Sequence, residues 1–186
     1  MLKQFPAKQK NQKTMKKVFL TLALVLTTVV ASAQWYVGGG LGFSKQDKAT
    51  SYEIKPEVGY KINDNWTVGA EVVFGKVKDT PNAFNGTTIA FNPYARYTFL
   101  TAGEFSMFAE AYASVQNKKP EGGDGETGFA LGVRPGVAYN IDENWTIAAK
   151  LGKGLNYQDK KYVGGADPKF ALELENELTF SLYYNF

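Results

Sequence analysis

The sequence of 186 residues contains no cysteine and no histidine. Without cysteine, the chain has no disulfide framework and no thiolate metal site. Without histidine, it cannot build a Ser-His-Asp triad, a Cys-His protease site or most catalytic zinc sites. Any catalysis would depend on carboxylates, Lys, Ser, Thr or Tyr alone. We therefore predict a protein that is not an enzyme and that has no cofactor and no metal site.

An excess of basic charge is also missing from most of the chain, although the formal net charge is +3. Residues 1–33 hold six of the 21 Lys and Arg and no acidic residue, so 15 basic residues stand against 18 acidic ones after position 33. That remainder has a net charge of −3. The basic total is thus no argument for a nucleic-acid partner, and we predict none.

The N-terminal segment is typical of a secretory signal. After Met15 come a basic pair, an apolar run and a small-x-small motif, which are Lys16-Lys17, residues 18–30 and Ala31-Ser32-Ala33. This order marks a cleavable signal peptide. The run of about 13 apolar residues is too short for a helix across a bilayer core of roughly 30 Å, and a short buried helix is the alternative. We predict an extended or non-native N-terminus at 1–14, a signal peptide at 15–33 and export through the periplasm.

After Gln34 the apolar residues alternate with polar ones, and no segment keeps the spacing of an amphipathic helix. The 19 Gly and 27 aromatic residues also favour short strands joined by turns. Alternation divides the remainder into eight segments, at 35–43, 52–62, 66–74, 88–99, 105–115, 129–139, 145–151 and 172–186. We predict an all-β fold over 34–186, an eight-stranded antiparallel up-and-down β-barrel.

The connections alternate in length, which places both ends of the barrel domain beside the short turns. The short turns are predicted at 63–65, 100–104 and 140–144, and the long loops at 44–51, 76–86, 116–127 and 156–169. Residues 56–67 and 135–146 form an internal repeat, because both read Pro-x-Val-x-Tyr-x-Ile-x-x-Asn-Trp-Thr. Each copy runs down a strand, through a tight turn and into the next strand.

Two kinds of barrel fit this pattern, a soluble lipocalin-like barrel and a transmembrane barrel. In the second, apolar side chains face lipid and aromatic side chains gather at the two interfaces. We predict the transmembrane form, because large aromatic residues of the apolar face gather beside the short turns. The predicted aromatic girdle contains Trp35, Tyr60, Trp66, Tyr97, Phe99, Phe105, Tyr139, Trp145 and Tyr184.

Charged residues occupy the opposite face of the same strands. In a soluble barrel they would face water, but in a transmembrane barrel they would point into the lumen. The interior of eight strands is only wide enough for side chains to fill it. We therefore predict a salt-bridge network that plugs the lumen, built from Glu57, Glu71, Arg96, Glu110, Arg134, Lys150 and Glu177. Gly38, Gly40 and Gly42 on the first strand would leave room for these long side chains.

Several features together resemble the small bacterial outer-membrane β-barrels of the OmpA/OmpX type. They are the signal peptide, the start Gln34-Trp-Tyr-Val-Gly-Gly-Gly40 and the ending Ser181-Leu-Tyr-Tyr-Asn-Phe186. The resemblance covers 34–186 and implies a porin-like barrel in the outer membrane of a Gram-negative cell envelope. It also implies outer-membrane lipids as partners and Phe186 as the signal read by the barrel-assembly machinery. No peptidoglycan-binding role is expected, since no such domain follows Phe186.

The function predicted from these observations is structural, or is an interaction at the cell surface through the four long loops. Their extracellular ligand is not identified by the sequence, because sites are grafted onto folds. The alternative is a narrow pore for ions or small solutes.

Overall fold

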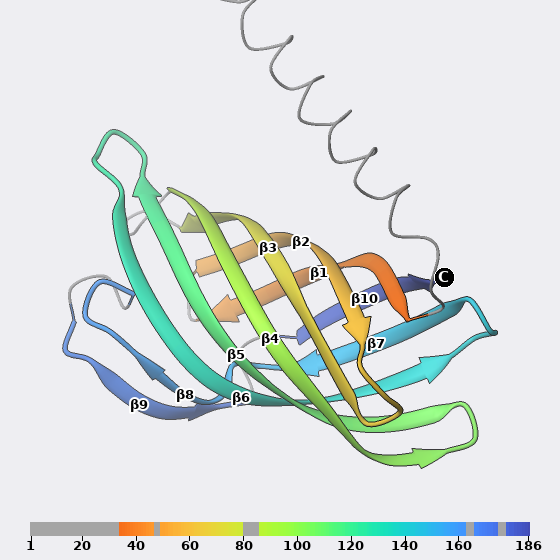
Figure 1. Cartoon of the computed structure of the whole chain (residues 1–186). Helices are drawn as coiled ribbons and strands as arrows, with labels where there is room; N and C mark the ends of the chain where they lie inside the picture. The colour runs from red at the N-terminus through yellow and green to blue at the C-terminus, as the bar shows by residue number, and fades with distance from the viewer. Residues whose placement is uncertain (1–33, 47–48, 80–85, 163–165, 175–177) are drawn as a thin grey trace, which may run out of the picture. The chain divides into compact units, whose positions relative to one another are not determined.

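The computed structural model describes residues 34–46, 49–79, 86–162, 166–174 and 178–186. Gln34–Phe186 form one compact unit, which Figure 1 shows as a tilted, curved sheet. The predicted N-terminus at 1–14 and signal peptide at 15–33 lie outside the described residues and stay predictions. Within the described ranges, no helix is long and apolar enough to cross a membrane.

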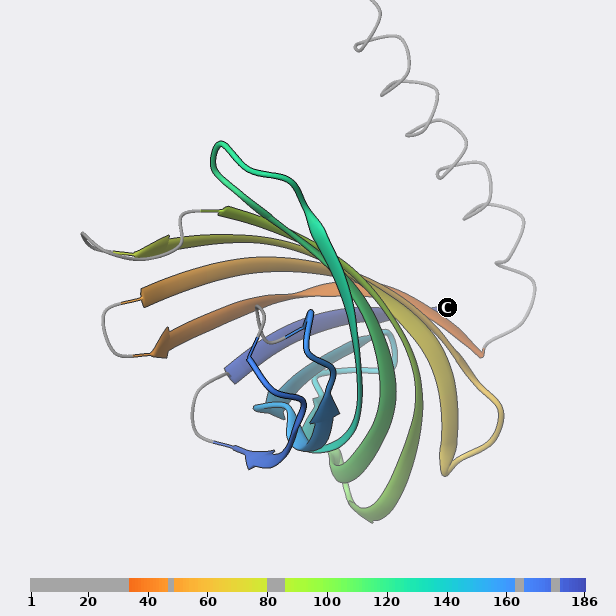
Figure 2. The same cartoon turned by 90° about the vertical axis from the view of Figure 1, so that its left-hand side faces the viewer.

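The described ranges contain ten strands, and each pairs with its neighbours in antiparallel fashion. They are β1 (Trp35–Gln46), β2 (Ala49–Lys61), β3 (Trp66–Asp79), β4 (Gly86–Ala102), β5 (Phe105–Pro120), β6 (Glu126–Asn140), β7 (Trp145–Leu151), β8 (Gly154–Gln158), β9 (Lys169–Glu173) and β10 (Leu178–Asn185). β1 to β6 pair in chain order, and β1 also pairs with β10, with Tyr36 opposite Asn185. The sheet therefore closes on itself, and Figure 2 shows the strands curving round an interior.

The ten strands make an eight-stranded barrel, because the last two barrel strands are each interrupted. β7 and β8 both pair with β6, and β9 and β10 continue the barrel beside them. The seventh strand breaks at Gly152 and Gly154, whose φ angles are 57° and 66°. A Cβ atom at Gly154 would also collide with the carbonyl oxygen of Val133, so this turn requires glycine. The predicted eight-stranded fold is confirmed.

The predicted boundaries of the four long loops were wrong, because the strands extend further into these connections than the hydrophobic alternation does. Residues 44–46, 49–51, 76–79, 86, 116–120, 126–127, 156–158 and 169 belong to strands rather than loops. Thr88 pairs with Lys118, for example, and Lys118 in turn pairs with Glu126. Strand pairing depends on backbone hydrogen bonds, so polar side chains above the apolar surface do not end it.

The internal repeat folds into two copies of the same turn. Asn63 Oδ1 accepts hydrogen bonds from the backbone N–H groups of Asn65 and Trp66, at 3.0 and 2.8 Å. Asp142 Oδ1 accepts the equivalent bonds from Asn144 and Trp145, at 2.8 and 2.7 Å. Such a short polar side chain stabilises a tight turn by bonding to the backbone two residues on. The repeat therefore encodes the turn and the Trp that starts the next strand.

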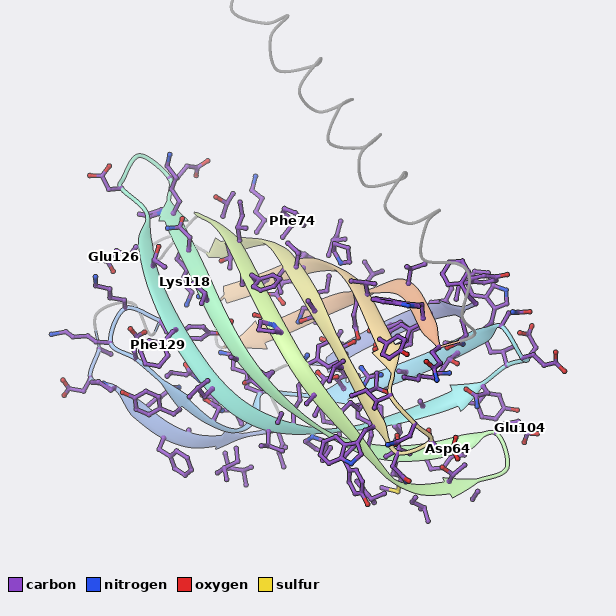
Figure 3. The ribbon with its side chains drawn as sticks, viewed as in Figure 1. Asp64, Phe74, Glu104, Lys118, Glu126 and Phe129 are labelled. Carbon is purple, nitrogen blue, oxygen red and sulfur yellow. The ribbon has the colours of Figure 1, made fainter. Side chains whose placement is uncertain are left out.

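The barrel is apolar on the outside and polar on the inside. Leu41, Ile54 and Phe180 expose 67%, 62% and 60% of their surface, and Figure 3 shows side chains projecting from the outer surface. The buried interior instead contains charged and amide side chains such as Lys55, Glu71 and Asn156. A soluble barrel has the opposite arrangement, so the lipocalin-like alternative does not fit.

The two ends of the barrel differ in the length of their connections, with tight turns at one end and longer loops at the other. In Figure 3, Asp64 and Glu104 lie in the tight turns at one end, and Lys118 and Glu126 lie at the other. We call these the turn end and the loop end. The N–H of Phe186 donates to the carbonyl oxygen of Trp35 at 3.0 Å, so the chain enters and leaves the barrel at the turn end.

Candidate functional site: the charged lumen

Six consecutive strands each contribute one charged side chain to the middle of the lumen. They are Glu57 of β2, Glu71 of β3, Arg96 of β4, Glu110 of β5, Arg134 of β6 and Lys150 of β7, and all six are buried. We call these six residues the charge cluster. Cross-strand pairing aligns them, since Glu57 lies opposite Glu71, and Glu110 lies between Arg96 and Arg134. Of the predicted network, only Glu177 lies outside the described residues.

Glu110 is held between two arginines. The Nε and Nη2 atoms of Arg96 donate to its Oε2 at 3.0 and 2.7 Å. The Nε and Nη2 atoms of Arg134 donate to its Oε1 at 2.8 and 2.6 Å. Both carboxylate oxygens therefore accept charge-assisted hydrogen bonds, which are short and roughly twice as strong as neutral ones.

Lys150 connects the two sides of the cluster. Its Nζ lies 2.8 Å from Glu57 Oε2, 3.0 Å from Glu71 Oε2 and 3.8 Å from Glu110 Oε1. Arg96 reaches Glu57 at 3.1 Å, and Arg134 reaches Glu71 at 3.6 Å. Three carboxylates thus face three cations in one connected network with no formal net charge. This balance offsets the large cost of burying each charge.

Polar and aromatic groups complete the bonding around the cluster. The hydroxyl groups of Tyr36, Tyr94 and Tyr183 donate to Glu57 at 3.2, 2.6 and 3.0 Å. Asn92 Nδ2 donates to Glu71 at 3.0 Å. Among the described residues, the buried side-chain atoms without a hydrogen-bond partner are Asn92 Oδ1, Gln116 Nε2 and Ser181 Oγ, and none belongs to the cluster.

Aromatic rings also cover the arginines. The Arg96 guanidinium carbon lies 4.3 Å from the ring centre of Phe108, and that of Arg134 lies 5.0 Å from the ring centre of Tyr112. These distances are within the range of cation–π attraction, which is stronger away from water. The rings pack around the arginines of the cluster.

Glycines on neighbouring strands make room for these rings. Tyr36 is paired with Gly59, Tyr94 with Gly69, Phe108 with Gly136, and Tyr112 with Gly132. At each of these glycines, the nearest neighbours of a Cβ atom would include atoms of the paired ring. The glycine gives the ring a place to lie flat against the barrel wall. Gly38, Gly40 and Gly42 of β1 also face inward, as their neighbours Tyr183, Thr179 and Lys55 show.

The predicted network omitted several members of the lumen, although the alternation already placed Lys55 and Glu53 on the charged face of the strands. Lys55 is buried beside Glu53 at 2.9 Å and donates to Thr179 Oγ1 at 3.1 Å. Tyr36 and Tyr183 also face inward, although large aromatic residues were expected on the outer surface. The signal was present in the alternation, because Lys55 shares the face of Glu57, and Tyr183 lies between the outward Leu182 and Tyr184.

The residues of the predicted aromatic girdle lie on the outer face at the turn end. Three pairs stand directly across neighbouring strands, namely Trp35–Tyr60, Trp66–Tyr97 and Trp145–Tyr184, with ring centres 5.0, 4.9 and 5.1 Å apart. Tyr139 pairs with Phe105 in the same way, and Phe99 exposes 54% of its surface. Their position at a membrane interface remains a prediction.

Phe186 follows β10, and its ring packs edge-on against Tyr184 with centres 5.2 Å apart. Its role as an assembly signal stays a prediction. Within the described ranges, no group of three or more His, Cys, Asp or Glu is placed to hold a metal ion.

Comparison with known proteins agrees with this architecture. The sequence matches the family described as "Outer membrane protein beta-barrel domain" over residues 18–186. An uncharacterized protein of Haemophilus influenzae is 27% identical over 163 residues, which cover 74% of this chain and 88% of that protein.

Two solved structures are similar to this chain at low sequence identity, and the first of them has the same fold. Neisserial surface protein A (NspA) is 20% identical with a TM-score of 0.59, and the match covers 83% of this chain and 98% of that one. The N-terminal β-barrel domain of Pseudomonas aeruginosa OprF is 18% identical with a TM-score of 0.49, over 81% and 97% of the two chains.

Proposed function

The chain belongs to the family of outer-membrane proteins with a β-barrel domain, and from this premise we propose that it is a non-enzymatic barrel with a closed lumen. Its function is then structural, or is an interaction of its loops with a ligand outside the cell. The chain reaches the membrane through the periplasm after loss of residues 1–33. The resemblance seen in the sequence is confirmed by the family match, and the assignment to the outer membrane follows from it.

The observation that carries the proposal is the charge cluster. Glu71 and Glu110 are fully buried at 0% exposure, and Lys150 Nζ lies within 4 Å of three carboxylates. Eight strands leave an interior just wide enough for side chains. A network of paired charges across that width leaves no room for a continuous water column, which supports a plug rather than a pore.

The outer surface supports insertion in a bilayer. Between the aromatic pairs of the turn end and Phe43, Phe129 and Tyr157 near the loop end, the exposed residues are mostly aliphatic. Aromatic side chains at two levels with aliphatic ones between them match the interfaces and core of a membrane. Outer-membrane barrels have short periplasmic turns and longer extracellular loops, so we place the turn end in the periplasm and the loop end outside the cell.

A narrow pore is the second candidate, and one observation favours it. A cavity of about 160 Å³ lies between the charge cluster and the loop end, lined by Ser51, Thr88, Ser114 and Arg134 among others. A pore would need only a rearrangement of Lys150 and the two arginines to join this cavity to the turn end. Six charged residues would then have to exchange partners inside the barrel, which is costly.

The test is the conductance of the purified protein in planar bilayers. The closed barrel predicts no stable open level, because the cluster spans the lumen. A steady, large single-channel conductance from the wild-type protein would reject the plug and favour the pore. Lys119→Gln is a suitable control variant, because Lys119 is exposed outside the lumen and its charge should not change the conductance.

A further inference from the structure

The cavity above the charge cluster is rich in cations. Its lining includes four cationic side chains, Lys55, Lys118, Arg134 and Lys153, against the single carboxylate of Glu53. Arg134 and Lys153 also pair with Glu110 and Glu173, which lie outside the lining. Its volume of about 160 Å³ is several times the ~30 Å³ share of one water molecule. The cavity can therefore hold a small anion, and its lining charges favour one.

Two of these lysines lie against the same aromatic ring. Lys118 Nζ lies 5.4 Å and Lys153 Nζ lies 5.6 Å from the ring centre of Tyr162. Lys118 Nζ also donates to the carbonyl oxygen of Tyr162 at 2.8 Å. Lys153 has Glu173 at 3.7 Å, whereas the described residues place no carboxylate within 4 Å of Lys118. Both ammonium groups lie beside this one ring, so they repel each other, and an anion bound beside them would offset that repulsion.

A buried amide supplies an independent sign of a ligand. Gln116 exposes only 8% of its surface and lines the cavity, and its Nε2 has no hydrogen-bond partner among the described residues. A buried N–H donor without an acceptor is costly, so such a group calls for a partner. Gln116 and Lys118 lie on the inner face of β5, two residues apart, so both can donate to one oxyanion.

We propose that the loop end of the lumen binds a phosphate group. Lys118 and Lys153 supply its charge-assisted hydrogen bonds, and Gln116 Nε2 supplies a neutral one. Asn92 Oδ1, an acceptor in the lining that lacks a partner among the described residues, suits a protonated phosphate oxygen. The inference goes beyond the proposed function and uses it in one respect. Because the lumen is closed at the charge cluster, a ligand enters the cavity from the loop end and binds there, and it does not pass through the barrel.

The group has two possible sources, free phosphate compounds in solution and the phosphate of a lipid headgroup. The strands of the barrel wall separate the cavity from the lipid-facing surface, which favours a soluble compound. Titration calorimetry with inorganic phosphate, on protein purified in a lipid-free and phosphate-free detergent, tests the first source. Titration of the same protein with phosphatidylglycerol in mixed micelles, without inorganic phosphate, tests the second.

The variants that test the site are Lys118→Gln and Gln116→Met. We expect saturable binding of inorganic phosphate by the wild-type protein and an affinity about tenfold lower in Lys118→Gln, since one charge-assisted hydrogen bond is lost. The matched control is Lys119→Gln, because Lys119 carries the same charge on the outer face of the same strand and should leave the affinity unchanged.

Three results would overturn the proposal. The first is the absence of saturable binding of either phosphate source by the wild-type protein. The second is an equal loss of affinity in Lys118→Gln and Lys119→Gln, which would indicate only the general charge of the loop end. The third concerns Gln116→Met, which replaces Lys118→Gln as the test if Lys118→Gln fails to fold. An unchanged affinity for phosphate in Gln116→Met would then reject the site. None of these results depends on conductance, so the phosphate site and the closed lumen are tested independently, and either proposal can be rejected without the other.

Discussion

Lys150 Nζ lies 2.8 Å from Glu57 Oε2, although 93 residues separate the two in the sequence. The contact crosses the lumen from β7 to β2, and both side chains are fully shielded from solvent. It joins opposite walls of the barrel and completes the charge cluster. The stability of the barrel should therefore depend on this pair.

Lys150→Met should destabilise the barrel by about 3–5 kcal/mol, the usual cost of removing one partner of a buried ion pair. The change leaves three buried carboxylates facing only two arginines. The measurement is the free energy of unfolding in urea, followed by the shift of the folded barrel on unboiled gels.

Glu57→Gln in the same chain restores a neutral cluster, so the double variant should regain part of the lost stability. Lys119→Met, at an exposed position, provides the matched control and should change little. Equal stability of Lys150→Met and wild type would contradict the buried network.

Gly132→Ala should destabilise the barrel because a methyl group there meets the ring of Tyr112. A Cβ atom would lie 2.8, 2.8 and 2.9 Å from three atoms of that side chain. Overpacking of this kind costs roughly 1–3 kcal/mol. The same substitution in a Tyr112→Ala background should cost much less, since the ring is gone. A similar cost in both backgrounds, measured by urea unfolding, would show that Gly132 is needed for another reason.

The three tryptophans of the chain provide a measure of membrane depth. Trp35, Trp66 and Trp145 each form an outward aromatic pair at the turn end. Their fluorescence should be quenched most by lipids brominated near the headgroup, because amphipathic rings prefer the interface. Strongest quenching by lipids brominated at the chain ends would place these residues in the bilayer core and reject the girdle.

A protease that cleaves after glutamate should cut intact cells at Glu121, in the connection between β5 and β6. Cleavage at Lys118 or Lys119 is not expected, because both lysines belong to β5 and are paired across strands. Glu104 and Glu143 are exposed in turns at the other end and should be cut only after the periplasm is opened. Cleavage of intact cells at Glu104 would invert the orientation.

The faces of the strands could be predicted from the sequence, because side chains alternate strictly along a strand. Glu71 and Val72, or Arg134 and Pro135, point to opposite sides whatever the rest of the barrel does. For this reason the structure brings together six of the predicted lumen residues. The exposed aromatic pairs at the turn end follow from the same alternation.

The contacts within the lumen could not be predicted in the same way. Lys150 meets Glu57 only because the tilt and stagger of eight strands bring the two to one level, and no local pattern records that geometry. The inward rings of Tyr36 and Tyr112 depend on glycines of the neighbouring strand. The interruption after β7 depends on the left-handed backbone at Gly152 and Gly154.

The central claim, a lumen closed at the charge cluster, can be tested with single cysteines because the chain contains none of its own. Ser106 and Ser114 both lie on the inner face of β5, four residues to either side of the buried Glu110. Ser106 lies on the turn-end side of the cluster, and Ser114 lies on the loop-end side. Asp64→Cys and Asp124→Cys, at exposed positions of the two ends, report how the barrels are oriented in liposomes.

The decisive measurement is the fraction of each cysteine modified by a small membrane-impermeant thiol reagent added outside sealed liposomes. A closed lumen predicts that Ser114→Cys is modified to the same fraction as Asp124→Cys, and Ser106→Cys to the same fraction as Asp64→Cys. The fractions of the two lumen positions should then add up to the whole population. If Ser106→Cys and Ser114→Cys are both modified completely, reagent passes the charge cluster, and the account of a plugged barrel is contradicted.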